Sequence, residues 1–233
     1  MQALEQLQRQ IMRCTYCPRL VAYRGQIART KRRQYRNWEY WGKPLPSFGD
    51  PRARLLVIGL APAAHGGNRT GRMFTGDQSG DWLYGTLHRF GFANQPTAQH
   101  RADGLILHDA YISAAARCVP PDNKPSRDEL ANCRPYLVRE LRLLRRVRVV
   151  VPLGKIAFDA YLAARHDLGQ PPPTARPHFA HQAVTRLPEG ILLIASYHPS
   201  RQNTQTGRLT QAMFDAVFAR VREELDASGD APS

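Results

Sequence analysis

Residues 54–77 read RLLVIGLAPAAHGGNRTGRMFTGD, and in this segment an apolar run passes directly into a glycine-rich loop. An unbroken apolar run of this length is typical of a strand that is buried on both faces. The Gly, Pro and Asn residues that follow allow tight turns and a close approach of the backbone to a ligand. The loop matches neither the phosphate-binding P-loop pattern nor the G-x-G-x-x-G pattern of dinucleotide sites. It contains no acidic residue before Asp77, which leaves open what chemistry a site here would perform.

The rest of the chain alternates strand and helix patterns. Further apolar runs typical of buried strands lie at 110–114, 147–153 and 191–197, and helical periodicity at 3–13, 82–89, 127–145, 155–165 and 209–225. Strands that alternate with helices form a parallel sheet with helices on both faces. We therefore predict an α/β fold with a central parallel four-stranded sheet. One domain is expected over residues 1–225, followed by a disordered tail at 226–233.

The chain is strongly basic. Its 233 residues carry a formal net charge of +14. An excess of this size favours a polyanionic partner, nucleic acid first, although an arginine-rich genome would give the same composition. Over residues 28–51 arginines suited to phosphate contacts interleave with aromatic rings suited either to base stacking or to core packing. No apolar stretch is long enough to span a membrane and the chain starts without an export pattern, so a cytoplasmic location without membrane contact is expected.

Four cysteines, Cys14, Cys17, Cys118 and Cys133, form one close C-x2-C pair and one distant pair. Disulfides are disfavoured in the cytoplasm. Two thiols separated by two residues bind one metal from a single turn, and the second pair would complete a tetrathiolate site if the fold brings the pairs together. The spacing fits zinc and an iron–sulfur cluster equally, and four unrelated buried thiols would also give it.

Three polar loops follow predicted strands, at 59–77, 117–126 and 196–207. Open α/β sheets bind their ligands at the carboxyl ends of strands, so these loops are expected to converge on one cleft. His198 stands at the end of its strand and is followed by Pro and Ser, which form a stiff turn that would aim the imidazole into that cleft. The alternative is a histidine with only a structural role.

The three loops and the cysteine spacing together resemble the uracil-DNA glycosylase superfamily, and most closely its family 5, the iron–sulfur type. The resemblance extends from Cys14 to about residue 225. GLAPAAHGGNRTGRMFTGD at 59–77 is similar to the first family motif, HPSRQN at 198–203 to the second, and EYWGKPLPSFGDP at 39–51 to the segment before the first strand. The cysteines stand where the family has its cluster ligands, so the resemblance implies a 4Fe-4S cluster in place of zinc.

The resemblance implies a monofunctional DNA glycosylase of base excision repair, which flips uracil out of DNA and hydrolyses its N-glycosidic bond to leave an abasic site. By similarity, Phe74 stacks on the base and the backbone at Gly59 and Ala61 forms one wall. Other branches carry an acidic or amide residue just after the first strand, where this chain is apolar. The resemblance implies that Asp77 takes that role and orients the attacking water, and that His198 donates a hydrogen bond to the base oxygen. Otherwise Asp77 would serve only as a helix cap.

Two positions bear on which bases are accepted. Related families place an Asn near the end of the second strand, where this chain has Ala114. A small apolar side chain removes a discriminating hydrogen bond, which predicts acceptance of other deaminated bases such as hypoxanthine. Asn123 would supply a replacement amide, or act only as a turn residue among prolines.

The expected DNA contacts are Arg69 and Arg72 in the first loop, and Arg201 and Asn203 beside the second motif. Double-stranded and single-stranded DNA containing deaminated bases is the expected substrate, and the protein is expected to act as a monomer. Two other interpretations stay open. One is a non-catalytic iron–sulfur protein that binds DNA, because no carboxylate follows the first strand, and the other is a zinc-stabilised α/β hydrolase of small nucleosides.

Overall fold

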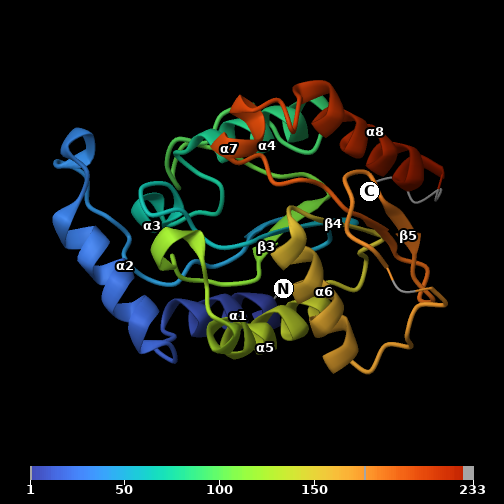
Figure 1. The fold of residues 1–233 in the computed structure, drawn as a ribbon, viewed down its shortest axis with the longest axis horizontal. Helices are drawn as coiled ribbons and strands as arrows, with labels where there is room; N and C mark the ends of the chain where they lie inside the picture. Colours follow the sequence, from blue (N-terminus) through green and yellow to red (C-terminus); the bar gives the residue numbers. More distant parts are fainter. Residues whose placement is uncertain (1, 176, 228–233) are drawn as a thin grey trace.

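A six-stranded mixed sheet forms the centre of the computed structural model, which describes residues 2–175 and 177–227 (Figure 1). The strands, in sheet order, are β1 (Phe48–Gly49), β3 (Ala110–Ala114), β2 (Leu55–Gly59), β4 (Val149–Pro152), β6 (Leu192–Ile194) and β5 (Val184–Arg186). The middle four are parallel and the two edge strands are antiparallel to their neighbours. The predicted parallel four-stranded sheet is therefore corrected to a mixed sheet of six strands.

The register of the central strands brings the polar loops together. Gly59, the last residue of β2, lies opposite Ala114, the last residue of β3. On its other side, β2 pairs with β4, and a bridge joins Leu153 beyond β4 to Ser196 beyond β6. The carboxyl ends of the parallel strands therefore lie along one edge of the sheet, as their alternation with helices predicts.

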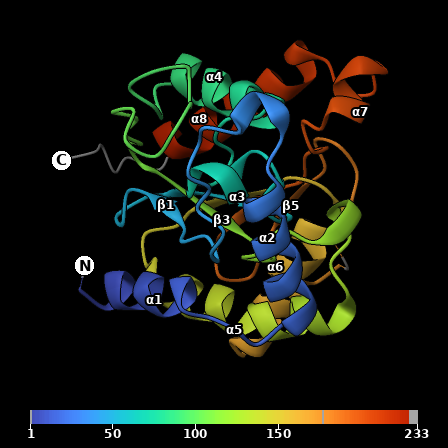
Figure 2. The ribbon, with the colours of Figure 1, turned by 90° about the vertical axis from the view of Figure 1, so that its left-hand side faces the viewer.

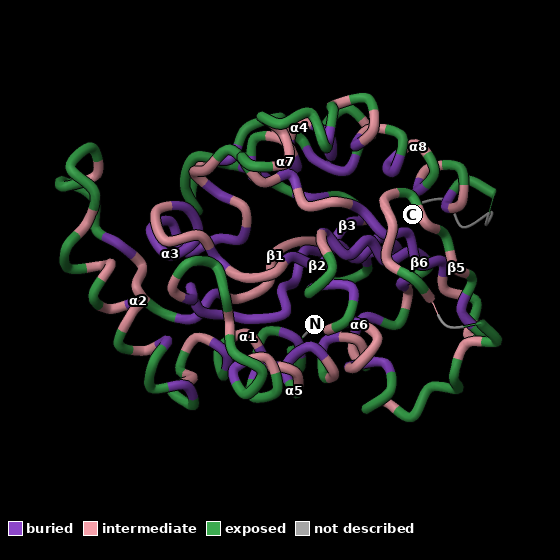
Figure 3. The backbone as a smooth tube through the Cα atoms, in the orientation of Figure 1, coloured by how far each residue is buried: buried purple, intermediate pink, exposed green. Residues whose placement is uncertain are grey.

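Helices cover both faces of the sheet, which confirms that part of the prediction (Figure 1). The helices are α1 (Gln2–Met12), α2 (Pro18–Thr30), α3 (Gly67–Thr70), α4 (Gln78–Arg89), α5 (Arg127–Leu143), α6 (Lys155–Asp167), α7 (Arg201–Gln205) and α8 (Gln211–Ala227). Side chains alternate between the faces of β2, so that Leu55 and Val57 pack with α4 and α8, whereas Leu56 and Ile58 pack with α1, α5 and α6. The residues packed between the sheet and the helices are buried on both faces, and β2, β3 and β6 are coloured as buried in Figure 3.

A buried ion pair connects α5, on the sheet face that also carries α1 and α6, to the strands. Arg117, just beyond β3, is 1% exposed and pairs with Glu140 of α5, which is fully buried. Ser113 of β3 donates a hydrogen bond to the same carboxylate at 2.6 Å, and Gln8 of α1 donates one at 2.9 Å. Because the partners come from α1, β3 and α5, this network fixes the two helices against the strand.

Helix α2 was absent from the sequence prediction. It begins at Pro18, directly after Cys17, and its sequence carries a weak apolar pattern because little of the helix is buried. Residues 31–38, which we call the basic arm, follow its C-terminus and extend away from the sheet (Figures 1 and 2). The arm turns through a short 3₁₀ helix, Arg33–Tyr35.

The end of the chain differs from the predicted boundary. Helix α8 continues to Ala227, so the first two residues of the predicted tail at 226–233 are helical, and 228–233 lie outside the described residues. Among the residues that the structure describes, no helix is long and apolar enough to cross a membrane.

Candidate active site

A cavity of about 370 Å³ lies at the carboxyl ends of β2 and β3. Its lining residues are Gly59, Leu60, Ala61, Pro62, Ala63, Met73, Phe74, Asp77, Ser79, Ala114, Asn123, His198, Ser200 and Arg201. All three polar loops contribute to this set. The structure therefore brings together every residue that the sequence assigned to catalysis or base binding, and Arg201 with them.

An aromatic ring and an imidazole form one side of the cavity. The rings of Phe74 and His198 are stacked, with centroids 5.9 Å apart and an interplanar angle of 28°. Phe74 has a positive φ of 51°, which turns its ring back over the end of β2. A Cβ added at Gly59 would lie 2.7 Å from Cζ of this ring. Glycine at position 59 is therefore what allows the Phe74 ring to lie against the strand.

Asp77 has two functions in the structure, because it caps α4 and also lines the cavity. Its Oδ1 accepts a hydrogen bond from the Gly80 N–H at 3.0 Å. Its Oδ2 lies against Gly66, where an added Cβ would stand only 1.9 Å away. The Gly-Gly pair of the opening loop is the sequence signal for this contact, which sequence reasoning missed. Asp77 is therefore more than a helix cap, because its side chain also lines the cavity.

The electrostatic environment of Asp77 disfavours its charge. Burial is the largest influence and raises the pKa of the carboxyl group above its ordinary value. The N–H groups of Gly80 and Ser79 and the charge of Arg69 act against this increase, whereas the nearby Asp81 adds to it. The carboxylate is thus destabilised relative to an exposed aspartate and retains backbone N–H groups that solvate it.

His198 is held as a neutral imidazole. Burial lowers its pKa to about 4, so that the ring carries no charge at neutral pH. The backbone position is set by Asn203, whose amide donates a hydrogen bond to the His198 carbonyl at 2.8 Å. Asn203 is itself positioned in α7, which the Ser200 hydroxyl caps by accepting from the Asn203 N–H at 3.3 Å. The structure thus gives Asn203 a role in holding the histidine, and its contact with DNA stays a prediction.

Two arginines lie inside the protein and not on the expected DNA-binding surface. Arg72 is 4% exposed and makes a two-point ion pair with Asp103. Arg69 is 3% exposed and donates hydrogen bonds to backbone carbonyls. Because both guanidinium groups are occupied within the fold, neither is available for the phosphate contact that the sequence suggested. Arg201, which is exposed and lines the cavity, keeps a DNA contact as a prediction, as Asn203 does.

The four cysteines are free thiols gathered from three parts of the chain. Cys17 and Cys118 pack in one buried cluster, and Cys118 lies within electrostatic range of Cys14. Cys133, on α5, is likewise within electrostatic range of Cys17 and Cys118. In the described part of the chain, no three His, Cys, Asp or Glu side chains have a geometry that would hold a metal ion. The fold therefore brings the predicted ligands near one another without a preformed site.

The composition of the cavity defines what it can do chemically. It offers a flat aromatic surface, a neutral imidazole, a partly desolvated carboxylate and the backbone of Gly59 to Ala63. A planar ligand with polar edges fits such a cavity, and a carboxylate beside it can orient water. Lysine is absent from the lining among the residues that the structure describes, so the cavity provides no amine nucleophile.

Comparison with known proteins gives the same family. The model of the Uracil DNA glycosylase superfamily matches residues 46–222. A protein named Type-5 uracil-DNA glycosylase from Thermus thermophilus is 50% identical over 209 residues, which are 90% of this chain and 92% of the relative. Proteins of the same name from Mycobacterium leprae and Mycobacterium tuberculosis are 46% and 47% identical, over 95% and 90% of this chain and 95% and 77% of the relatives. The chain therefore belongs to the uracil DNA glycosylase superfamily and, within it, to the type-5 family.

Proposed function

We propose that the protein is a monofunctional DNA glycosylase that removes uracil from DNA. The observation that carries this proposal is the cavity in which Phe74, Asp77 and His198 meet. A base must leave the duplex before its glycosidic bond can be reached, and an extruded base needs a close-fitting pocket with a ring to stack on. The names of the type-5 relatives support the same activity. They also disfavour both a non-catalytic DNA-binding protein and a hydrolase of small nucleosides.

Asp77 acts on the sugar side of the bond. Breaking the N-glycosidic bond leaves positive charge on the deoxyribose, and an ionised carboxylate stabilises that charge and orients the water that attacks it. The N–H groups of Gly80 and Ser79 point at the carboxylate and keep it in place. Hydrolysis then leaves an abasic site. Since no lysine lines the described cavity, a covalent lyase step has no nucleophile there.

His198 acts on the base side of the bond. The departing base carries negative charge on its oxygen, and a neutral imidazole N–H donates a hydrogen bond to that oxygen without carrying an excess proton. A pKa of about 4 keeps the ring neutral throughout the physiological range. Removing one such donor costs roughly 3–4 kcal/mol of transition-state stabilisation in comparable sites. Phe74, stacked on His198, supplies the surface against which the base lies.

The cavity leaves room for bases other than uracil. Ala114 lines it at the end of β3 and has no polar atom in its side chain with which to distinguish one base edge from another. Asn123, also in the lining, is the amide that the second loop offers. We therefore propose that hypoxanthine and other deaminated bases are accepted in addition to uracil, from double-stranded or single-stranded DNA.

The thiols have the chemistry of a 4Fe-4S site, and we propose that Cys14, Cys17, Cys118 and Cys133 hold such a cluster. Burial raises the pKa of Cys118, so its thiolate needs a positive partner. The Arg24 guanidinium provides one, with Nη1 2.9 Å from the Cys118 sulfur. When bound, the cluster would join the N-terminal segment to α5 as a structural link.

Asn132 adds a second polar contact in the same region, because its amide lies 3.6 Å from the sulfur of Cys17. Hydrogen bonds of this kind surround sulfur ligands of iron–sulfur clusters and adjust their charge.

The expected cytoplasmic location and the expected monomer stay predictions.

The test is a glycosylase assay on duplexes that carry uracil, hypoxanthine or xanthine at one position, followed by alkali to cut abasic sites. We expect a cut at uracil and at hypoxanthine and none in the undamaged duplex. If uracil-containing DNA stays intact, the proposed function is wrong. A cut at uracil alone would keep the function and contradict the broad base acceptance attributed to Ala114.

A further inference from the structure

Arg69 connects the basic arm to the loop that carries Asp77. Two rings of the arm lie against its guanidinium, with Cζ 3.9 Å from the centroid of Tyr35 and 4.1 Å from that of Trp38, and the two rings meet edge to face at an interplanar angle of 73°. Its Nη2 donates to the carbonyl of Gly76 at 3.0 Å, and Gly76 immediately precedes Asp77. One buried side chain thus contacts both segments.

The contact between Arg69 and Gly76 is tight on both sides. Gly76 has a φ of 76°, and an added Cβ would lie 2.3 Å from Nη2 of Arg69. On its other edge, Nε of Arg69 donates to the carbonyl of His65 at 2.7 Å. His65 precedes Gly66, against which the carboxylate of Asp77 packs. The guanidinium therefore fixes the two backbone segments that enclose the Asp77 side chain.

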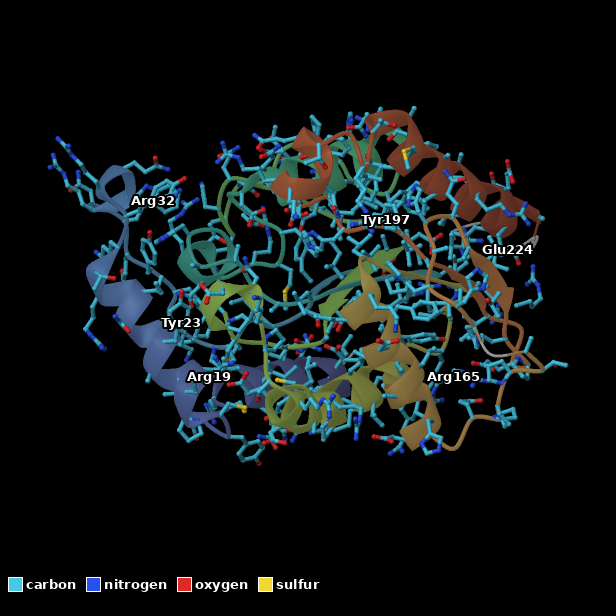
Figure 4. All side chains as sticks on the ribbon, viewed as in Figure 1. Arg19, Tyr23, Arg32, Arg165, Tyr197 and Glu224 are labelled. Carbon is cyan, nitrogen blue, oxygen red and sulfur yellow. The ribbon has the colours of Figure 1, made fainter. Side chains whose placement is uncertain are left out.

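The arm holds Arg69 through its aromatic residues and presents its arginines outward. Arg33 and Arg36 are exposed, as is Arg32, which is labelled beside the arm in Figure 4. Each ring makes a cation–π contact with the guanidinium, and such a contact strengthens as water is excluded. Because the two rings are nearly perpendicular, they restrict the guanidinium in two directions and keep it near the two carbonyls it binds.

We propose that Arg69 is a positioning residue for the catalytic carboxylate, and that the Tyr35–Trp38 pair of the basic arm is the part of the protein that holds it in place. This proposal rests on the role proposed for Asp77. The arm is then a structural component of the active site and not only a surface extension. Misplacing a catalytic group by about 1 Å lowers rates by about 100-fold, so loosening this link should act on the chemical step.

The experiment measures single-turnover cleavage of uracil-containing duplex as a function of pH, with affinity for undamaged duplex and melting temperature measured alongside. The variants are Y35A/W38A, which removes both rings that contact Arg69 but leaves Arg69 itself, and the replacements R69Q and R69K. R165Q is the control for loss of a buried arginine, because Arg165 is about as buried as Arg69, binds a carbonyl and the carboxylate of Glu189, and lies at the opposite end of the molecule from the basic arm (Figure 4).

We expect the Y35A/W38A and R69Q variants to lose about 10- to 100-fold in single-turnover rate. The groups near Asp77 include Asp81, Tyr84, the N–H groups of Ser79 and Gly80, Arg69 and, in the same cavity lining, His198. Arg69 lowers the pKa of Asp77, so its loss should move the acid limb of the pH profile to higher pH. R69K keeps the positive charge but cannot bind two carbonyls as the guanidinium does. Relative to R69Q, it should return the acid limb of the pH profile to its wild-type position without restoring the rate. R165Q should keep the wild-type rate.

Wild-type rate and pH profile in Y35A/W38A would overturn the proposal, as would an equal loss of rate in R165Q, which would show a general effect of lost stability. The variant D77N, run in parallel, separates this proposal from the function itself. If D77N loses activity while Y35A/W38A keeps it, only the role of Arg69 and the arm is wrong. If D77N keeps the wild-type rate, the roles of both Asp77 and Arg69 are wrong.

Discussion

At the scale of single residues, the site depends on two groups whose pKa values are shifted in opposite directions by their surroundings. Burial raises the pKa of Asp77 and lowers that of His198 to about 4. Both shifts favour the uncharged form, and only the carboxylate has N–H groups that counter its shift. The proposed mechanism needs a neutral His198 and an ionised Asp77, and the N–H groups at Asp77 favour the ionised form that burial disfavours.

These states predict the pH dependence of the single-turnover rate. Asp77 must be ionised, and its pKa is raised above 3.8, so the rate should fall on the acid side at a higher pH than for an exposed aspartate. His198 is already neutral above about 4 and should add no inflection near its ordinary pKa of 6.5. The measurement is the rate at saturating enzyme over the pH range, with affinity for undamaged duplex as control. An inflection at the ordinary histidine pKa in the rate alone would contradict the neutral imidazole.

The sequence predicted the lining of the cavity but not the partners inside the loops. Phe74 and His198 follow buried strands, and parallel strands bring their carboxyl ends together, so their meeting was predictable. The predicted DNA contacts of Arg69 and Arg72 conflict with their burial, which is unusual for arginine. Their burial depends on Tyr35, Trp38 and Asp103, which come from distant parts of the chain, and one sequence carries no signal for such pairing.

At the scale of elements, the predicted strands and helices are confirmed wherever an apolar pattern is strong. Strand β3 has its predicted bounds, and α5 begins at its predicted residue, where Ser126 and Glu129 form a capping box in the structure. The edge strands β1 and β5 were missed because they are two and three residues long and lack a buried face. Helix α2 was missed because its surface is mostly exposed, which leaves few apolar positions to reveal a period.

The buried pair of Arg117 and Glu140 predicts a large effect on stability. The variant E140Q should lower the free energy of unfolding by about 3–5 kcal/mol, because it leaves the guanidinium of Arg117 without its charge partner. The measurement is urea unfolding. R134Q is the control, because Arg134 and Asp167 form a partly exposed pair whose loss should cost less than about 1 kcal/mol. Equal stability of the two variants would contradict the structural role of the buried pair.

The gathering of the thiols predicts the cofactor content of the purified protein. Wild-type protein purified without oxygen should contain iron and sulfide and absorb visible light, since iron–sulfur clusters are coloured and zinc is not. C118S should lose most of the iron, because Cys118 neighbours both thiols of the N-terminal pair. The melting temperature of C118S is compared with that of T206S, a surface substitution that keeps the hydroxyl group and lies far from the thiols in sequence. Wild-type protein with zinc and no iron would contradict the proposed cluster.

At the scale of the whole molecule, positive charge is distributed beyond the cavity. The net charge is +14, and the basic arm carries part of it away from the sheet (Figure 1). Charge of this kind binds the phosphate backbone without regard to sequence and suits an enzyme that must search undamaged DNA. The overall charge was predictable from composition, whereas the arm as a separate structure was not.

The arm predicts the salt dependence of DNA binding. In R33Q/R36Q, the slope of log affinity against log salt should become shallower by roughly 0.9 for each phosphate that the variant no longer neutralises. Both arginines are exposed in the arm. R142Q/R145Q removes the same charge around the C-terminal end of α5, where both side chains are exposed, and should change the slope less. Fluorescence anisotropy with undamaged duplex gives both slopes, and equal slopes would contradict binding of the arm to DNA.

The most direct test is the single-turnover rate of D77N and H198A on uracil-containing duplex at neutral pH. We expect a loss of at least about 100-fold for D77N. For H198A, which removes the hydrogen-bond donor, we expect a loss of about 100- to 1000-fold. Both variants should bind undamaged duplex as the wild type does. A wild-type rate for either variant would show that the cavity does not act on the glycosidic bond from both sides, and would contradict the account.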